Sequence, residues 1–479
     1  GRRVAVIGAG PTGIAAGREL LRQGFTDLTI IDAQDGPGGT WRLHTYPGLA
    51  CDVWAHSYSF TYAPNPDWSA NFVTQPEILA YLERCTAEFG LEPHLILGTR
   101  IVAAHLQQDH TWQLHTDGGA VLAFDVVINA MGNQHTPLFP DVPGRESFGG
   151  ASFHGTRWDH DVALEGKRVA VVGSAASAVQ IVPEVARRAA HLSVLQRSPN
   201  WIVPRRLKPY TDAQRRRWRR FPVLMSMVRR LQSLALGQVE YAVTVGHPRM
   251  RQFERMATSY LRRTITDPEV RAALTPDTRY GCKRGLVSDD FYPAFNLDHV
   301  ELVPSALERV TPTGLVTADG RVIDVDVIIY CTGYRVLDFD RIVVGVGGRR
   351  LADAMARAPQ VYKGIAVPDF PNYFLAVGPN GLVLNVSYFE TAEQNVATIV
   401  RLLGDLCDGA HAAMDARAEL SAAYNEGLAD KFAAFSWGAA DCRSYYRTAS
   451  GHAPFLFPGN IRAWRRIQSE ITLAEFDLV

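Results

Sequence analysis

Closely spaced cysteines and long apolar runs are absent from this sequence. Its six cysteines lie far apart, with no Cys-x-x-Cys pair among them, which excludes the spacing of a zinc knuckle or of a redox-active dithiol loop. A disulfide reductase, which needs two neighbouring cysteines, is excluded on the same ground. The cysteine pattern instead predicts a protein of the reducing cytoplasm. No run approaches the ~18 apolar residues of a membrane span, and the first one, Val4–Ile7, leads into a glycine motif and not into a signal-peptide cleavage site.

Excess charge of either sign is absent as well. The chain has 49 Lys and Arg against 49 Asp and Glu, a balance that argues against a nucleic-acid-binding protein. With 47% hydrophobic residues it is also unlike a disordered chain. At about 150 residues per domain, the 479 residues suffice for about three domains. No group of residues has the spacing of a metal site, so none is predicted.

A strand followed by Gly-x-Gly-x-x-Gly opens the chain. The three glycines are Gly8, Gly10 and Gly13. The first makes a tight turn, the second lets a pyrophosphate approach the backbone, and the third lets the next helix pack on the strand. A second expected strand, at 28–31, ends in Asp32. A carboxylate at this place accepts both hydroxyls of an adenosine ribose, which predicts FAD or NAD.

The same pattern returns at residues 168–178, which read RVAVVGSAASA. The turn and the start of the next helix are formed by Gly173, Ser174, Ala175, Ser177 and Ala178. Where the first copy has an acid, the second has Arg197, followed by Ser198. A guanidinium suits a ribose 2′-phosphate, so the second cofactor is predicted to be NADPH. Because Ala175 replaces the middle glycine, a duplicate that binds no nucleotide remains the alternative.

The two copies of the pattern also end in the same way, with a hairpin and a buried strand that finishes at a glycine. This glycine is Gly132 in the first copy and Gly333 in the second. The sequence therefore predicts an α/β fold with two doubly wound, Rossmann-like dinucleotide-binding domains and a helical insertion. The expected FAD-binding domain comprises 1–145 and 335–479. The expected NADP-binding domain comprises 146–205 and 281–334, and the insertion comprises 206–280.

The insertion is rich in arginine. Its basic cluster consists of Arg215, Arg216, Arg217, Arg219 and Arg220, and an apolar run follows at 221–228. Two interpretations stay open. The favoured one is a solvated helical segment with its arginines turned outward, and the other is a basic amphipathic helix on a membrane surface.

Two long motifs connect this chain to a known family. Residues 38–52 match [A/G]-G-x-W-x-x-x-x-[F/Y]-P-[G/M]-x-x-x-D, and residues 148–159 match F-x-G-x-x-x-H-x-x-x-W-[P/D]. The second motif is carried by Phe148, Gly150, His154, Trp158 and Asp159. Along nearly its whole length the sequence resembles the type I Baeyer–Villiger monooxygenases, which are class B flavin-dependent monooxygenases. Trp158 favours this branch, because related enzymes that oxidise nitrogen or sulfur typically have Tyr or Phe there.

The resemblance implies a reaction and its cofactors. In this family NADPH reduces FAD, O2 adds to the flavin as a C4a-peroxide, and the peroxide anion attacks a small-molecule ketone to give an ester or lactone. By match to the family's Lys-Arg segment, Arg284 would stabilise the peroxyflavin and Lys283 would approach the NADP phosphate. Asp52 matches the acid that holds this arginine. The alternatives are a surface ion pair for Arg284 and a turn residue for Asp52.

The remaining site residues also follow from the resemblance. Thr40 and Trp41 are expected to contact FAD, and Tyr58 is either a further contact or a core residue. Gly378 precedes an expected helix at 388–403 whose positive end faces the flavin. His154 is interpreted as a strut between domains, with a general base as the alternative, and Trp158 as a packing anchor.

Two other functions stay open. One is oxygenation of nitrogen or sulfur, or hydroxylation, by a class B flavin monooxygenase. The other is a catalytically inactive nucleotide-binding scaffold. The identity of the ketone and the oligomeric state are not predicted.

Overall fold

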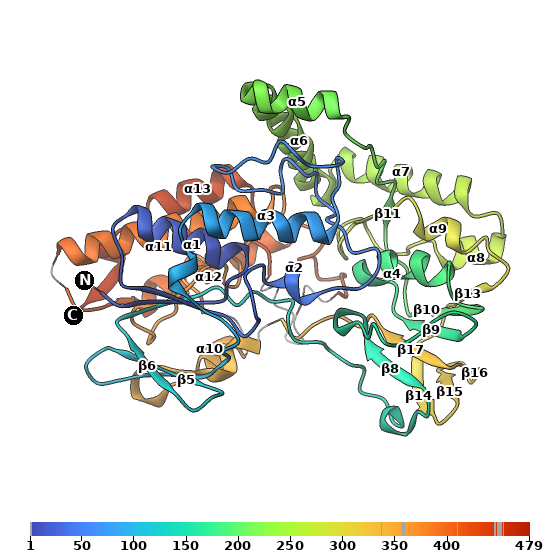
Figure 1. Cartoon of the computed structure of the whole chain (residues 1–479), viewed down its shortest axis with the longest axis horizontal. Coiled ribbons are helices and arrows are strands. Elements are labelled where there is room, and N and C mark those ends of the chain that lie inside the picture. The colour runs from blue at the N-terminus through green and yellow to red at the C-terminus, as the bar shows by residue number, and fades with distance from the viewer. Residues whose placement is uncertain are drawn as a thin grey trace.

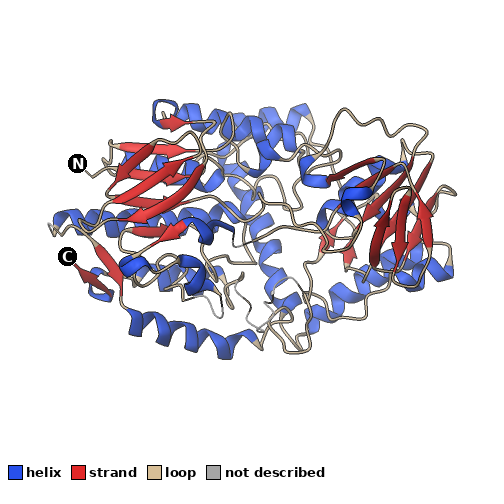
Figure 2. Ribbon diagram, turned by 90° about the horizontal axis from the view of Figure 1, so that it is seen from below, coloured by secondary structure: helices blue, strands red, loops and turns tan. Residues whose placement is uncertain are grey.

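The computed structural model describes residues 2–336, 338–356, 360–409, 411–444, 447, 453 and 455–479. Two five-stranded sheets lie at opposite ends of the molecule, with helices around both (Figures 1 and 2). Both sheets are parallel throughout. This confirms the predicted α/β class with two doubly wound units.

The first sheet grows from the N-terminal glycine motif. Its strands in spatial order are β19 (Tyr373–Leu375), β7 (Val126–Asn129), β1 (Val4–Ile7), β2 (Leu28–Ile31) and β3 (Leu95–Ile96). One face packs on α1 (Pro11–Arg22), α3 (Gln75–Glu88) and α11 (Tyr388–Asp408). The other face packs on the antiparallel strands β4 (Ile101–Leu106), β5 (Trp112–Thr116) and β6 (Val121–Phe124). Through β19 and α11, the C-terminal part of the chain returns to this sheet.

The second sheet repeats this plan. Its strands in spatial order are β13 (Val300–Val303), β10 (His191–Leu195), β9 (Arg168–Val172), β17 (Val327–Tyr330) and β8 (Ala151–His154). Helices α4 (Ala176–Ala186) and α9 (Phe291–Ala294) cover one face. The strands β14 (Leu307–Thr311), β15 (Gly314–Thr317) and β16 (Val322–Asp324) cover the other. The central strands are buried and mostly apolar, as in VAVI of β1 and VIIY of β17, and for this reason they could be found from the sequence.

The arginine-rich segment folds as helices that lie between the short paired strands β11 (Ile202–Val203) and β12 (Leu286–Val287). These helices are α5 (Asp212–Arg220), α6 (Pro222–Val243), α7 (Pro248–Thr264) and α8 (Pro268–Ala273). Figure 1 shows α5 and the start of α6 projecting from the body of the molecule. No helix in the described part of the chain has the length and apolar character needed to cross a membrane.

Further α-helices and strands complete the described part of the chain. They are α2 (Thr40–Leu43), β18 (Val343–Val344), α10 (Leu351–Met355), β20 (Met414–Ala416), α12 (Ala418–Phe432), α13 (Ile461–Ser469) and β21 (Phe476–Leu478). Strand β20 pairs with β21, and β18 joins β4 at the edge of the first antiparallel sheet.

Candidate active site

The turn between β1 and α1 has no room for side chains. Gly8 has φ +109°, and a Cβ built there would lie 2.6 Å from the Ala130 carbonyl oxygen. At Gly13 a Cβ would overlap the carbonyl of Gly8. Gly10 meets a second glycine turn, since a Cβ on Gly39 would lie 2.7 Å from the Gly10 Cα atom. A tight glycine turn directly before a helix directs the first backbone N–H groups of that helix toward a pyrophosphate, as a dinucleotide requires.

Asp32 lies beside this turn, at the end of β2. Its carboxylate accepts hydrogen bonds from the backbone amides of Ala9 (2.6 Å) and Gln34 (2.8 Å). Burial raises its pKa, and these two hydrogen bonds oppose the shift. Each carboxylate oxygen has a second lone pair, so Asp32 can hold the glycine turn and still accept from a ribose.

The other predicted FAD contacts belong to the same region. Thr40 and Trp41 begin the short helix α2, directly after Gly39. The Trp41 indole donates to the Tyr58 hydroxyl at 3.1 Å, and the Tyr58 ring packs edge-on against Phe389 at the start of α11. Burial raises the pKa of Tyr58 far above its ordinary value. Tyr58 is thus half-buried against the core, and its contact with FAD stays a prediction.

Gly378 packs closely against the backbone of Gly364. Its amide donates a hydrogen bond to the Gly364 carbonyl at 3.0 Å. Helix α11 begins ten residues later, and Ser387 caps it by accepting from the Glu390 amide. The helix start is tied to the glycine turn because Tyr388 and Thr12 hydroxyls hydrogen-bond at 2.9 Å. The positive end of α11 therefore lies beside the start of α1.

The second glycine turn repeats the first. Gly173 has φ +114°, and a Cβ there would lie 2.5 Å from the Cys331 carbonyl oxygen, as Gly8 lies against Ala130. Ala175 stands before α4 with φ −88° and ψ −162°, close to the −75° and −174° of Gly10 before α1. This conformation needs no glycine. The substitution therefore leaves the turn intact and adds one methyl group to its surface.

The residues around this turn are held by the second unit and its neighbours. Ser174 is buried, and its carbonyl accepts from the Asn200 side chain at 3.0 Å. Ser177 lies near the phenols of Tyr46 and Tyr334, where it opposes the rise in pKa that burial causes in both. Ala178 packs in the core under β9.

A cationic cluster follows β10. Lys283 Nζ donates to Ser198 Oγ (2.6 Å) and to the Pro199 carbonyl (3.1 Å). Burial lowers the pKa of Lys283; Asp277 opposes this shift and Arg197 adds to it. The two cations are thus close enough to influence each other. Lys283, Arg197 and Ser198 form the donor set that a 2′-phosphate needs.

Arg284, the residue after Lys283, contacts a different part of the molecule. Arg284 Nη2 donates to Asp52 Oδ2 at 2.5 Å, although the two residues are 232 positions apart. Their side chains are 39% and 26% exposed. Consecutive residues therefore contact the region after β10 on one side and the loop after α2 on the other.

The family motif at 148–159 has a local structural role at several positions. A Cβ on Gly150 would strike the Phe148 ring, Trp158 packs edge-on against Phe153, and exposed Asp159 accepts from the Asp161 amide in a turn. His154 differs, because it is buried at the end of β8 and hydrogen-bonds with Thr156 Oγ1 at 2.8 Å. Burial and the nearby Arg157 lower its pKa to about 4, so it is neutral at physiological pH.

Tyr334 is a residue that the sequence reasoning missed. Its ring stacks on His44 (centroids 5.7 Å apart) and lies 6.3 Å from the His154 ring. Burial lowers the pKa of His44 to about 4 as well, and Arg157 also lies near both histidines. Tyr334 directly follows the glycine that ends the second hairpin. That position was the available signal for a residue joining the two units.

One pair of residues was not found from the sequence. Cys282 and Cys442 are far apart along the chain, and they form a disulfide in the structure. Separation along the chain does not limit proximity once the insertion and the C-terminal segment pack together. Four other cysteines are free, of which Cys51, Cys85 and Cys331 are buried and Cys407 is exposed. Among the residues that the structure describes, no group of His, Cys, Asp or Glu could hold a metal ion.

The fold defines an α/β architecture with two similar glycine turns, each of the kind that binds a dinucleotide. Residues 1–343 match the model of the flavin-binding monooxygenase-like family, and the chain belongs to this family. It is 36% identical to a Baeyer–Villiger monooxygenase of Pseudomonas aeruginosa, over 99% of this chain and 91% of that protein. It is 37% identical to one of Streptomyces coelicolor, over 100% of this chain and 92% of that protein.

Solved structures agree. The OTEMO complex with FAD and NADP superimposes with a TM-score of 0.89 at 25% identity, covering 100% of this chain and 99% of that one. Cyclohexanone monooxygenase from Rhodococcus, bound to NADP+, gives 0.88 at 26% identity with the same coverage. The resemblance stated from the sequence is confirmed, and the chain is a flavin-dependent monooxygenase of the Baeyer–Villiger type.

Proposed function

We propose that this enzyme uses NADPH and FAD to insert one atom of O2 next to the carbonyl carbon of a small-molecule ketone, forming an ester or lactone. One observation carries the proposal. The consecutive cations Lys283 and Arg284 hydrogen-bond to opposite parts of the molecule, Ser198 and Asp52. Such a pair can bind the nicotinamide cofactor and act on the reacting oxygen at the same time.

We assign FAD to segments 1–145 and 335–479, and NADPH to segments 146–205 and 281–334. In support, β19 and α11 from the C-terminal segment complete the first unit. Strands β13 and β17 from the later segment complete the second. Segment 206–280 is then an insertion into the NADP unit.

The first glycine turn fits FAD. It brings Gly10 and Gly39 together, Asp32 stands at the end of β2, and the positive end of α11 is close by. When bound and reduced, the flavin supplies the reaction with O2. The chain's own residues would orient it: the glycine turn at the pyrophosphate and Asp32 at the ribose, with Thr40 and Trp41 next to the turn.

Arg284 would stabilise the negative charge that develops on oxygen as the carbonyl carbon is attacked. Its guanidinium stays protonated at any physiological pH, and its planar set of donors orients an anion better than an ammonium does. Asp52 holds the guanidinium in place and offsets the cost of a fixed cation in a partly buried site. We assign Arg284 the catalytic role and Asp52 the positioning of Arg284.

His154 would serve as a strut. It is neutral, lies at the end of β8, and contacts Thr156 and Phe139. These contacts belong to the segment that connects the two units, and we assign His154 no proton transfer. The cytoplasmic location expected from the sequence stays a prediction, which cell fractionation tests.

Arg284→Ala tests the proposal. The variant should bind FAD and oxidise NADPH but form no ester, because the charge on oxygen is no longer stabilised. The matched control is Arg321→Ala, since Arg321 is an exposed arginine whose partner, Glu301, lies on β13. Chromatography of the products from a set of ketones is the measurement. A normal ester yield from Arg284→Ala contradicts the role of this residue, and wild-type enzyme that makes only N- or S-oxides contradicts the reaction.

A further inference from the structure

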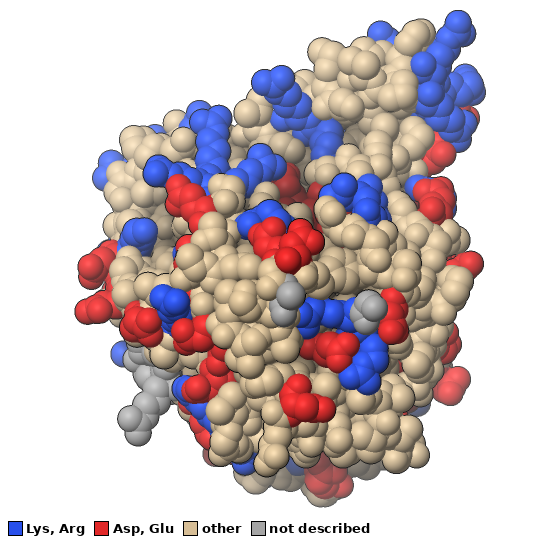
Figure 3. Space-filling model, turned by 90° about the vertical axis from the view of Figure 1, so that its left-hand side faces the viewer, with Lys and Arg blue, Asp and Glu red and all other residues tan. Residues whose placement is uncertain are grey.

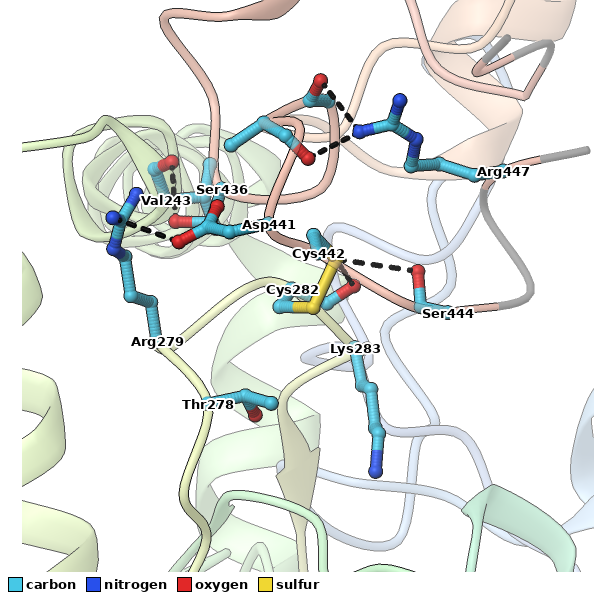
Figure 4. The surroundings of a disulfide bond; sticks show 12 residues. Val243, Thr278, Arg279, Cys282, Lys283, Ser436, Asp441, Cys442, Ser444 and Arg447 are labelled. Atoms are coloured by element: carbon cyan, nitrogen blue, oxygen red, sulfur yellow. Dashed lines mark hydrogen bonds and ion pairs between the residues drawn. A yellow bond between two sulfur atoms is a disulfide. The ribbon is translucent and has the colours of Figure 1, made fainter. Parts of the chain in front are cut away.

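The loop that carries Lys283 and Arg284 is tied covalently to the C-terminal part of the chain. Cys282, the residue directly before these cations, forms a disulfide with Cys442, and both cysteines are buried. Figure 4 shows Lys283 extending away from the disulfide. A restraint on the backbone at residue 282 therefore acts at the base of both side chains.

Several noncovalent contacts also hold this loop. It runs from the end of α8 to β12 without a helix or strand. The Trp201 indole donates to the Thr278 carbonyl at 2.8 Å, and the Tyr280 ring is buried beside Trp201. Arg279 forms an ion pair with Asp441 at 2.8 Å, which makes a second link to the segment that contains Cys442 (Figure 4).

The segment on the other side of the disulfide is anchored. The Ser436 amide donates to the Val243 carbonyl at the end of α6 (2.8 Å), and the Trp437 side chain is buried in a core cluster. Gly281 packs against the same Val243, with φ +85° and no room for a side chain. The end of α6, the loop and segment 436–442 therefore pack together, and the disulfide links the loop covalently to segment 436–442.

We propose that the Cys282–Cys442 disulfide is a positioning element of the active site, which fixes Lys283 and Arg284 relative to the two cofactors. The inference rests on the roles assigned above to these two cations. With the disulfide intact, Lys283 reaches Ser198 and Arg284 reaches Asp52. When the bond is opened, the loop gains freedom, NADPH binds less tightly, and NADPH consumption is less tightly coupled to ester formation.

The bond itself is tested first, by a count of thiols that does not depend on activity. Enzyme purified without reductant and unfolded in guanidinium should show four reactive thiols. After dithiothreitol it should show six, since the reductant gives two electrons, becomes a cyclic disulfide and leaves the thiols of Cys282 and Cys442. Six thiols before reduction overturn the proposal.

Cys442→Ser then tests the role. We expect KM for NADPH to rise about tenfold, because a displaced Lys283 loses much of its charge-assisted hydrogen bond to the cofactor phosphate. We also expect a larger share of the NADPH consumed to yield hydrogen peroxide in place of ester. FAD content should stay normal. Cys85→Ser is the control, since Cys85 is a buried free thiol in α3.

A purely structural bond would give a different result: a lower melting temperature with unchanged KM and unchanged ester per NADPH, and this overturns the proposal. If Cys442→Ser does not fold, wild-type enzyme preincubated with dithiothreitol replaces it, and reoxidation should restore coupling. An error in the role assigned to Arg284 can be distinguished from an error in the role assigned to the disulfide, because KM for NADPH depends on Lys283. If Arg284→Ala remains coupled while Cys442→Ser raises KM, the assignment of Arg284 fails and the positioning role stands.

Helix α6 presents a second, independent anomaly, because only Met225, Ala242 and Val243 are buried on it, while large apolar side chains are exposed along its length. Its inward side carries Arg229, which donates to Ser59 Oγ at 3.0 Å, and Glu240, which accepts from Asn385 at 3.1 Å. Its outward side carries a stripe of large apolar side chains that are 44% to 71% exposed. The stripe consists of Val223, Met227, Leu231, Leu234 and Tyr241. Spacings of three, four and seven residues place these on one face, and a contiguous exposed patch of this kind marks an interaction surface.

Basic side chains gather at one end of this stripe. Arg216, Arg217, Arg219 and Arg220 on α5 are exposed, and Arg230 on α6 is exposed next to the stripe. Figure 3 shows Lys and Arg gathered on the part of the molecule that projects beyond the body. Of the α5 arginines, Arg219 pairs with Asp67 and Arg215 with Asp212. The projection therefore presents apolar and positively charged groups together.

We infer that this stripe docks on an anionic lipid surface, with the α5 arginines at the phosphates. A 22-residue helix is about 33 Å long, and one helix face about 10 Å wide then offers roughly 330 Å². A stable protein interface needs about 800 Å² per partner. The stripe is too narrow for a second copy of the chain, whereas a projecting helix suits a flat bilayer.

Sedimentation of the full chain with vesicles tests this. We expect binding to vesicles of phosphatidylglycerol and phosphatidylcholine, little binding to phosphatidylcholine alone, and loss of binding at high salt. Leu231→Ser/Leu234→Ser should reduce binding about tenfold, and the control Val102→Ser/Val322→Ser, which changes exposed apolar residues elsewhere, should not. Absence of binding at low salt overturns the inference. So does a dimer in gel filtration that Leu231→Ser/Leu234→Ser dissociates.

Discussion

Neutralising Asp52 is the most direct test of how the two units cooperate. In Asp52→Asn the side chain keeps its size and an oxygen that can accept from Arg284, so only the charge is lost. Hydrogen bonds to charged groups contribute about 1.5–3 kcal/mol. Because the pair is partly exposed, solvent screening reduces the contribution of its charge. We therefore expect about 1–1.5 kcal/mol, which is about a tenfold loss of kcat/KM for the ketone.

The assay follows ester formation and NADPH oxidation in the same reaction. The ester rate should fall about tenfold, and Asp52→Ala, which removes the acceptor as well, should lose more. FAD content should not change, since Asp52 positions Arg284 and does not hold the flavin in this scheme. The control is Asp326→Asn, which neutralises the acid of an exposed pair with Arg168 at the start of β9. If Asp52→Asn forms ester at the wild-type rate, the ion pair is only structural and the reasoning is refuted.

Three further outcomes follow from the structure. Arg197→Ala should raise KM for NADPH about 10- to 100-fold and leave KM for NADH unchanged, because only NADPH has the 2′-phosphate; equal effects on both cofactors would place the phosphate elsewhere. Cys442→Ser should lower the free energy of unfolding by about 2–5 kcal/mol, since the disulfide closes a loop of 160 residues, and a denaturant titration with and without dithiothreitol measures this. Burial raises the pKa of Asp415 to about 7, so this residue should make the protein lose stability as pH rises from about 4 to about 7; Asp415→Asn should flatten that part of the melting-temperature profile, and an unchanged slope would contradict it.

Local patterns allowed much of the fold to be predicted. The central strands of both sheets are short, mostly apolar runs, and each glycine turn follows directly from one of them, so strand, turn and helix could be read within about 30 residues. The residues of the second turn could be aligned with the first because the same spacing recurs. The close approach of Gly8 to Ala130 and of Gly173 to Cys331 shows that the two turns are equivalent in three dimensions as well.

The contacts that join the units could not be predicted in the same way. The ion pair of Arg284 with Asp52 was expected only from the family resemblance, because no rule of spacing connects residues so far apart. Tyr334 follows a recognised strand end, but its stacking on His44 depends on how the units pack. The disulfide was missed for the same reason: cysteine spacing excludes a local dithiol motif and gives no information about long-range pairs.

Helix α6 shows where a sequence pattern can mislead. An apolar run after a cluster of arginines predicts a helix with its apolar side buried and its arginines outward, and α5 fulfils the second half of that expectation. On α6, however, the inward side combines the buried residues Met225, Ala242 and Val243 with polar contacts such as that of Arg229 with Ser59, and Leu231 and Leu234 lie outside. Periodicity specifies that a helix has two faces, whereas the partners available on the rest of the molecule decide which face is buried. The exposed face of α6 is therefore a property of the whole chain and could be found only in the structure.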